Sequence, residues 1–184
     1  MRILLLGDVC GPAGMKIIQS KLKELIKEKK IDFTIANGEN AADSGKGITK
    51  KNFNDLMNSG VNVVTSGNHI WDQKEILEII DEEKKLIRPA NLLEGQPGKG
   101  FEIYEIKNKR IAVINLIGNV FMKKSQDLFS FTEKIIKNIQ LKKNADFIIV
   151  DIHGEITSEK MALGHFLDGK VTTVVGTHTH VPTS

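Results

Sequence analysis

The sequence VTTVVGTHTH, residues 171–180, decides how the rest of the chain is interpreted. Its β-branched residues, bounded by Gly176, predict a buried strand. His178 and His180 follow, and residues just past the carboxyl end of a strand are where open α/β sheets place their sites. If Thr177 to His180 stays extended, both imidazoles point to the same side, because side chains alternate with period two. Such a pair can bind two metal ions, whereas the alternative for an isolated pair is two surface histidines in a turn.

Other predicted strands end in the same kind of residue. Short apolar runs predict buried strands over residues 2–6, 32–36, 61–66 and 147–152. The acids, amides and imidazoles that follow these strands are Asp8, Glu39, Asn40, Asn68, His69 and His153. In a parallel sheet with right-handed crossovers, the carboxyl ends lie along one edge. We therefore expect these residues to converge with the histidine pair in one site.

Helices are expected between the strands, so the predicted fold class is α/β, a mixed sheet core flanked by helices. Apolar spacing predicts helices over residues 15–30, 50–58, 73–84, 129–142 and 158–167. Thr49 is the expected N-cap of the second helix, and Asp72 with Glu75 predicts a capping box for the third. Further short strands are expected over residues 86–88, 101–106 and 110–116, with a hairpin turn at Asn108-Lys109.

The composition limits the class of protein. A chain of 184 residues, 40% hydrophobic and 27% charged, is expected to form one globular domain. No apolar run approaches the roughly 20 residues needed to span a bilayer, and a single cysteine, Cys10, fits a reducing compartment, so we expect a cytoplasmic protein. A net charge of +3 is too balanced for a nucleic-acid-binding surface, so no stable nucleic-acid complex is expected. Assembly with further copies of the chain stays open.

The candidate ligands indicate transition-metal chemistry. Three imidazoles, two carboxylates and two amides suit first-row divalent ions better than calcium or magnesium, which favour all-oxygen shells. Seven ligands exceed the needs of one tetrahedral ion, so two ions about 3.5–4 Å apart, bridged by a carboxylate and a hydroxide, are expected. Such a pair predicts hydrolysis of a phosphoric ester by the bridging hydroxide.

The ordered motifs resemble those of the calcineurin-like metallophosphoesterases. These motifs are Gly7-Asp8, Gly38-Glu39-Asn40, Gly67-Asn68-His69, His153 and Gly176-Thr-His-Thr-His180. More narrowly, residues 3–11, 37–42, 88–91, 97–100 and 157–160 are similar to those of the bacterial YmdB-like phosphodiesterases. The resemblance covers essentially the whole chain and implies a two-sheet sandwich.

The resemblance also implies a role for each candidate. Glu39 would bridge both ions, Asp8, Asn40 and His180 would complete one shell, and Asn68, His153 and His178 the other. His69 would approach the phosphoryl group unliganded, as a transition-state donor or general acid. The implied cofactors are two iron or manganese ions, and the implied substrate is a small phosphodiester, above all a 2′,3′-cyclic nucleotide. The alternatives are a phosphomonoesterase or nuclease with the same metals, or a metal-binding regulatory protein with little turnover.

Two departures from the family pattern stand out. The wider superfamily has a histidine two residues after its first aspartate, where this chain has Cys10, and we do not expect Cys10 to be a ligand. The family continues past its last histidine motif, so we expect that the C-terminal portion of the domain lies outside residues 1–184. Near the motifs, Asp151 and Glu155 are candidates for a layer of residues behind the ligands, and Asp72 for orienting His69 if it does not cap a helix.

Overall fold

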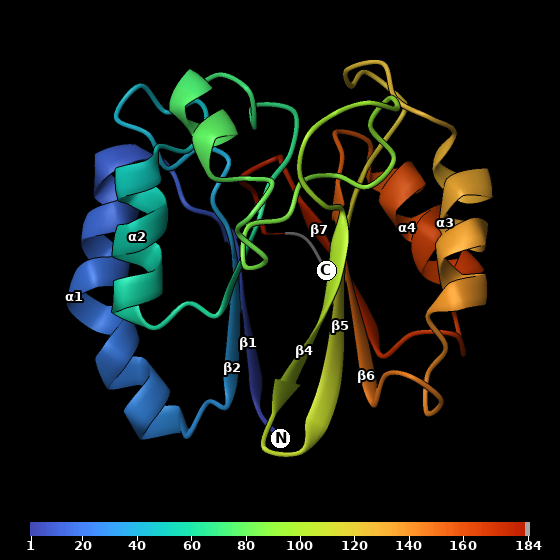
Figure 1. Cartoon of the computed structure of the whole chain (residues 1–184), viewed down its shortest axis with the longest axis horizontal. Coiled ribbons are helices and arrows are strands. Elements are labelled where there is room, and N and C mark those ends of the chain that lie inside the picture. Colours follow the sequence, from blue (N-terminus) through green and yellow to red (C-terminus); the bar gives the residue numbers. More distant parts are fainter. Residues whose placement is uncertain (183–184) are drawn as a thin grey trace.

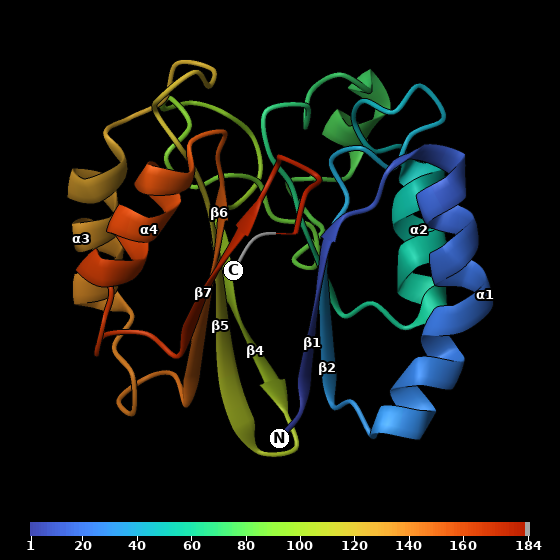
Figure 2. The same ribbon diagram turned by 180° about the vertical axis from the view of Figure 1, so that it is seen from behind.

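Two β-sheets face each other in the computed structural model, which describes residues 1–182 (Figures 1 and 2). The first sheet has the order β1-β2-β3 and is parallel, with strands β1 (Ile3–Asp8), β2 (Phe33–Asn37) and β3 (Val63–Thr65). The second has the order β4-β5-β6-β7, with strands β4 (Phe101–Ile106), β5 (Lys109–Ile117), β6 (Phe147–His153) and β7 (Thr173–Thr177). Only β4 runs antiparallel to its neighbour. The expected two-sheet sandwich is confirmed.

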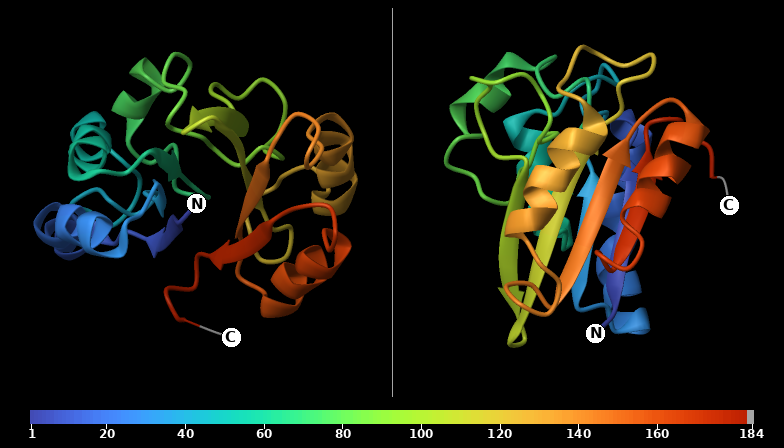
Figure 3. Two further views of the ribbon diagram at one scale, coloured as in Figure 1. Left: turned by 90° about the horizontal axis from the view of Figure 1, so that it is seen from below. Right: turned by 90° about the vertical axis from the view of Figure 1, so that its right-hand side faces the viewer.

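Helices cover the outer face of each sheet, as the end-on view in Figure 3 shows. Helices α1 (Gly11–Lys29) and α2 (Lys50–Ser59) lie on the first sheet, and α3 (Leu128–Asn138) and α4 (Thr157–Phe166) on the second. The Thr49 hydroxyl accepts a hydrogen bond from the Asn52 amide, which confirms the expected N-cap of α2. Helix α1 begins earlier than predicted, because Pro12 has the fixed backbone angle that suits a first helical turn.

The apolar core has three layers that follow this arrangement. Between the sheets, residues from both, such as Phe33, Val63 and Ile149, form one buried cluster. Two further clusters lie between each sheet and its helices. The layering explains why the strand sequences are nearly continuous apolar runs, since both faces of each strand are covered.

Two expectations about local structure are wrong. Residues 73–84 do not form an α-helix; only a short 3₁₀ helix, Lys74–Glu78, is present. The predicted capping box fails because its side chains are used elsewhere: Asp72 pairs with His69, and Glu75 accepts a hydrogen bond from the Lys50 amide. Residues 86–88 make only isolated bridges, at Leu86 and Ile87, rather than a strand.

The strand registers bring the carboxyl ends of both sheets to the same end of the molecule. Asp8 is the partner of Asn37, which is the partner of Thr65. In the second sheet His153 is the partner of Thr177. Strands β1 and β7, the edge strands of their sheets, lie against each other (Figure 2). Within residues 1–182, none of the helices combines the length and the apolar character that crossing a membrane would require.

Candidate metal centre

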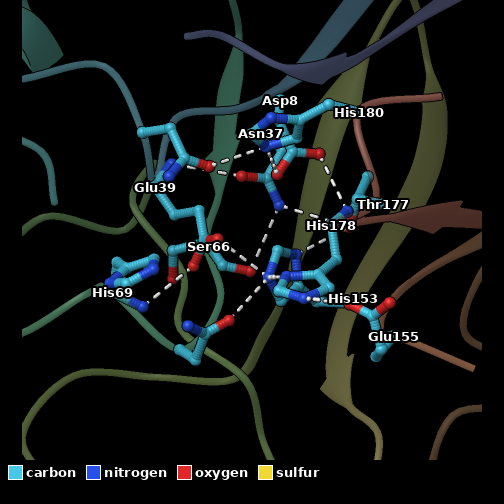
Figure 4. A network of polar contacts seen from close by, with 12 residues as sticks. Asp8, Asn37, Glu39, Ser66, His69, His153, Glu155, Thr177, His178 and His180 are labelled. Carbon is cyan, nitrogen blue, oxygen red and sulfur yellow. Dashed lines mark hydrogen bonds and ion pairs between the residues drawn. The ribbon is translucent and has the colours of Figure 1, made fainter. Parts of the chain in front are cut away.

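All seven predicted ligands lie together where the two sheets meet, as Figure 4 shows for the residues that it labels. Asp8 ends β1, Glu39 and Asn40 follow β2, Asn68 follows β3, and His153 ends β6. His178 and His180 follow β7. The convergence expected from the sequence is therefore present, and the side chains divide into two groups.

The first group gathers around one ring nitrogen of His153, a fully buried side chain. Glu39 Oε1 lies 2.8 Å from His153 Nε2, Asn68 Oδ1 lies 3.0 Å from it, and His178 Nδ1 lies 3.0 Å from it. A ring nitrogen carries at most one hydrogen, so it can make a hydrogen bond to only one of these three atoms. All four atoms can donate a lone pair, and they therefore fit a shared transition-metal cation.

The second group consists of Asp8, Asn40 and His180. His180 Nε2 lies 3.3 Å from Asn40 Oδ1 and 3.3 Å from Asp8 Oδ2. Asp8 Oδ2 is buried yet accepts no hydrogen bond from the described residues, 1–182, which is costly for a carboxylate oxygen. The other oxygen, Oδ1, accepts one from the His178 amide at 3.0 Å. An uncompensated buried oxygen beside an imidazole and an amide oxygen fits a second cation.

Glu39 is held in the first group by two contacts. Its side chain is 1% exposed, and Oε2 accepts a hydrogen bond from the His69 amide at 2.9 Å. Burial opposes its charge, but the hydrogen bond and charge of His153 outweigh burial and lower the pKa of Glu39. The side chain is therefore a carboxylate, the form that a metal ion needs.

The pKa values of the two imidazoles of the first group are shifted in opposite directions. Burial disfavours a charged His153, but the hydrogen bond and charge of Glu39 prevail and raise its pKa. Burial and then the charge of His153 lower the pKa of His178. The raised pKa of His153 favours a proton on this imidazole in the metal-free site, and a metal ion would have to displace that proton.

The space between Glu39 and His153 depends on Gly67. A Cβ added to Gly67 would lie 2.3 Å from Glu39 Oε2 and 2.3 Å from His153 Nε2. No side chain fits at this distance, so the glycine is required by the close approach of the two ligands. The glycine before Asn68 is in this way part of the site.

The loop after β7 differs from the expected extended conformation. His178 has φ 101° and His180 has φ 56°, both in the left-handed region that side chains rarely adopt. The turn sends His178 to the first group and His180 to the second. Residues held in such conformations cluster at functional sites.

His69 lies beside the two groups and not within them. Its Nδ1 is 2.7 Å from Asp72 Oδ2, and its amide bonds to Glu39. Lys123 binds the Asn68 carbonyl at 2.5 Å and lies 3.7 Å from Asp72, which adds a positive charge at this side of the site. Asp72 therefore orients His69 and does not cap a helix. Orienting His69 was the alternative role considered for Asp72 from the sequence.

Cys10 lies at the edge of the second group. Its sulfur is 3.5 Å from His180 Nδ1. Burial, and then the charges of Asp8 and Glu39, raise the pKa of the thiol, which favours the protonated form. Because the thiolate is the metal ligand, this environment favours the expectation that Cys10 does not bind metal.

A further layer of polar residues supports the ligands from behind. Asp151 accepts hydrogen bonds from the Thr65 and Thr177 hydroxyls, and Thr177 also contacts His153. Glu155 lies 2.9 Å from His178 Nε2. The sequence indicated Asp151 and Glu155 by proximity, but it gave no reason to select Thr65 or Thr177, since a threonine in a strand is ordinary.

A groove of about 720 Å³ opens beside the second group. It runs between α1 and the loop after β7, and its lining includes Asp8, Cys10, His178 and His180. Its volume lies within the range of small-molecule binding sites, about 300–1,000 Å³. Three of the candidate ligands, Asp8, His178 and His180, thus line an open groove.

Known proteins share this fold over the whole chain. The 2′,3′-cyclic-nucleotide 2′-phosphodiesterase of Bacillus subtilis is 46% identical over 184 residues, which is all of this chain and 69% of that protein. The crystal structure of a phosphatase from Mycoplasma pneumoniae has 39% identity and a TM-score of 0.90, covering 99% of this chain and 65% of that one. The crystal structure of the 5′-nucleotidase of Candida albicans has 15% identity and a TM-score of 0.57, and the match covers 97% of this chain and 42% of that protein's chain. This likeness concerns the fold alone.

The fold and these relatives define the class: the chain is a hydrolase of the metallophosphoesterase type. The family model of the YmdB-like proteins matches residues 4–184. The chain belongs to the YmdB-like family, as the resemblance of its motifs implied.

Proposed function

We propose that the chain hydrolyses phosphodiesters, most readily 2′,3′-cyclic nucleotides, with a pair of divalent transition-metal ions. The observation that carries the proposal is that seven candidate ligands form two neighbouring groups, one of which surrounds His153 and includes the buried carboxylate of Glu39. The activity named for the Bacillus subtilis relative supports the substrate class. Mixed imidazole, carboxylate and amide donors support iron or manganese rather than calcium or magnesium.

In this proposal Glu39 would be shared by the two ions. Asp8, Asn40 and His180 would hold one ion, and Asn68, His153 and His178 would hold the other. Two such ions supply a water of lowered pKa and neutralise charge on the phosphoryl oxygens. The protein contributes the fixed geometry, because every ligand lies at or just after the end of a strand.

His69 has a separate role in the proposal. Its Nδ1 is bound to Asp72 at 2.7 Å, so Nε2 is the nitrogen left for the substrate. When water adds to phosphorus and the P–O2′ bond breaks, the leaving oxygen needs a proton. Protonated His69 donates it from Nε2, or, without full transfer, hydrogen-bonds the charge that develops.

Residues 1–184 act as one domain in this proposal. The apolar cluster between the sheets takes residues from β2, β3, β5 and β6 together, so neither sheet has a core of its own on that face. The ligands likewise come from both sheets. A cut between the sheets would therefore divide both the core and the site.

Turnover of a 2′,3′-cyclic nucleotide and of a nucleoside monophosphate, measured on one metal-loaded sample, tests the substrate class. We expect faster hydrolysis of the cyclic diester. Faster hydrolysis of the monoester would favour the phosphomonoesterase alternative, which the Mycoplasma relative's name suggests. Bound metal without turnover on either substrate would favour a regulatory protein.

The substitution His69→Asn tests the role of His69. Loss of an acid–base group lowers the rate about 10²- to 10⁴-fold, while the metal content stays at the wild-type value. His165→Asn is the matched control, since His165 is exposed on α4. Loss of metal in the His69 variant would contradict an unliganded role.

A further inference from the structure

Both histidines of the first ligand group are held at the ring nitrogen that faces away from the group. His153 Nδ1 lies 3.0 Å from Thr177 Oγ1, while its Nε2 faces Glu39. His178 is arranged the opposite way, with Nε2 2.9 Å from Glu155 Oε2 and Nδ1 toward the group. The two imidazoles would thus use different nitrogens toward the same ion.

Hydrogen-bond chemistry fixes the direction of the contact at Thr177. Its hydroxyl donates to Asp151 Oδ1 at 2.7 Å. Burial raises the pKa of Asp151, but Thr65, Thr177 and Asn37 all donate to it, the arrangement that favours its carboxylate form, which can only accept. A hydroxyl has a single hydrogen, so Thr177 Oγ1 is left to accept from His153 Nδ1–H. In the metal-free site a hydrogen on Nε2 faces Glu39 as well. A metal ion would displace that hydrogen and leave His153 as the Nδ1–H tautomer, with its Nε2 lone pair toward the group.

Asp151 is anchored so that it cannot turn away from Thr177. Its side chain is buried, and its other oxygen, Oδ2, accepts from the Thr65 hydroxyl at 2.5 Å and from the Asn37 amide at 3.3 Å. Thr65 and Asn37 end strands of the first sheet, whereas Asp151 belongs to the second. The series of hydrogen bonds from His153 through Thr177 to Asp151 is therefore held in place by residues of both sheets.

Glu155 orients His178 in the same way, but at a more solvent-exposed position. Its carboxylate accepts from His178 Nε2–H, so Nδ1 keeps the lone pair. The Glu155 side chain is 48% exposed, so water can replace it as an acceptor. The support of His178 is weaker than that of His153.

We infer that Thr177, held by Asp151, and Glu155 are positioning residues that set opposite tautomers of His153 and His178, so that Nε2 of one and Nδ1 of the other bind one metal ion. The inference rests on the proposed metal centre. In this inference, residues that contact no ion determine which nitrogen of each histidine is free to bind the metal. Ligating histidines are usually oriented in this way, by a hydrogen bond at their other ring nitrogen.

The first test reads the tautomers directly. Nitrogen-15 NMR of labelled histidine distinguishes Nδ1–H from Nε2–H, and it is measured on metal-free Glu39→Ala protein, in which no carboxylate competes for the hydrogen at Nε2. In this background we expect neutral His153 as Nδ1–H with Thr177 intact and in Thr177→Ser, and a mixture in Thr177→Val. A hydrogen on Nε2 with Thr177 intact, or an unchanged tautomer in Thr177→Val, would overturn the inference.

Asp151→Asn gives a second variant with a sharper expectation. Thr65 and Asn37 both donate to one side of this residue, so the amide oxygen stays there and the NH₂ group faces Thr177. Thr177 then accepts from the amide and donates to His153 Nδ1, which moves the imidazole hydrogen to Nε2. Retention of Nδ1–H in this variant would contradict the relay; the same substitution produces the wrong tautomer in serine-protease triads.

Metal affinity, measured by competition with a chelator for manganese, gives the second readout. We expect about 10- to 100-fold weaker binding in Thr177→Val, the range for loss of a residue that orients a ligand. Glu155→Ala should lose less, because water replaces the carboxylate. Thr132→Val, which removes a buried hydroxyl that donates to the Leu128 carbonyl within α3, is the control and should bind manganese like the wild type.

The two readouts separate this inference from the proposed function. If the wild type binds no manganese, the metal centre fails, and the NMR result still decides whether Thr177 sets the tautomer. If the wild type binds manganese but Thr177→Val binds equally well, the positioning role fails and the metal centre stands.

Discussion

At the scale of single residues, the site depends on a glycine as much as on its ligands. Gly67 leaves the room in which Glu39 and His153 approach each other. The candidate ligands could be selected from the sequence, because acids and imidazoles after strand ends are conspicuous, and the structure brings them together. The requirement for glycine at position 67 could not be predicted from the sequence. It arises only because the fold brings together Glu39 and His153, which are 114 residues apart in the chain.

Gly67→Ala is therefore expected to disrupt the centre. The added methyl group would push Glu39 or His153 away, and we expect metal affinity to fall about 10-fold or more, as for other disturbed ligand sets. Gly164→Ala is the control, because a Cβ at Gly164 meets no atom within 4 Å. Wild-type metal affinity in the Gly67 variant would show that the ligands do not need this space.

At the scale of secondary structure, apolar periodicity predicted most strands and helices, with ends displaced by a few residues. It failed where side chains bond outside their own segment. Asp72 and Glu75 have capping spacing, but His69 and Lys50 engage them instead, and no α-helix forms there. The turn at His178 was also missed, because a left-handed conformation at a non-glycine residue leaves no trace in the sequence pattern.

Thr49 allows a test of the local interactions that determine where helix α2 begins. Its hydroxyl accepts from the Asn52 amide at 3.0 Å at the start of α2. Thr49→Ala should lower the free energy of unfolding by about 1 kcal/mol, whereas Thr49→Ser should preserve most of it. Urea denaturation measures both variants, and equal midpoints would mean that the cap contributes nothing to stability.

At the scale of the whole molecule, the site and the fold share one polar cluster. Asp151 on β6 is bound by residues at the ends of β2 and β3, so it joins the two sheets directly beneath the ligands. The sequence predicted that the strand ends converge, but it did not predict this cluster, because strand registers are set by packing of the two sheets. Stability and ligand geometry are therefore linked through the same contacts.

The stability of the metal-free protein should consequently depend on pH. The pKa of His153 is raised in the folded state, chiefly by Glu39 acting against burial. Protonated His153 therefore stabilises the fold fully below the unfolded-state pKa of about 6.5, and this contribution is lost as the pH rises through the folded-state pKa.

Thermal unfolding after chelator treatment checks this expectation. The wild-type Tm should fall as the pH rises above about 6.5, and the Tm of His153→Gln should fall less over the same interval. Identical pH profiles of the two proteins would show that the protonation of His153 does not contribute.

The most direct test of the account is the metal content of the chain, purified without chelator, with hydrolysis of a 2′,3′-cyclic nucleotide measured on the same sample. We predict about two transition-metal ions per chain in the wild type, and loss of both ions and of turnover in Glu39→Gln, which removes the bridging charge. Glu102→Gln, at a surface ion pair with Lys99, should keep both ions. A folded wild-type protein that binds one ion or none, or a Glu39 variant with unchanged metal and rate, would contradict the dinuclear centre.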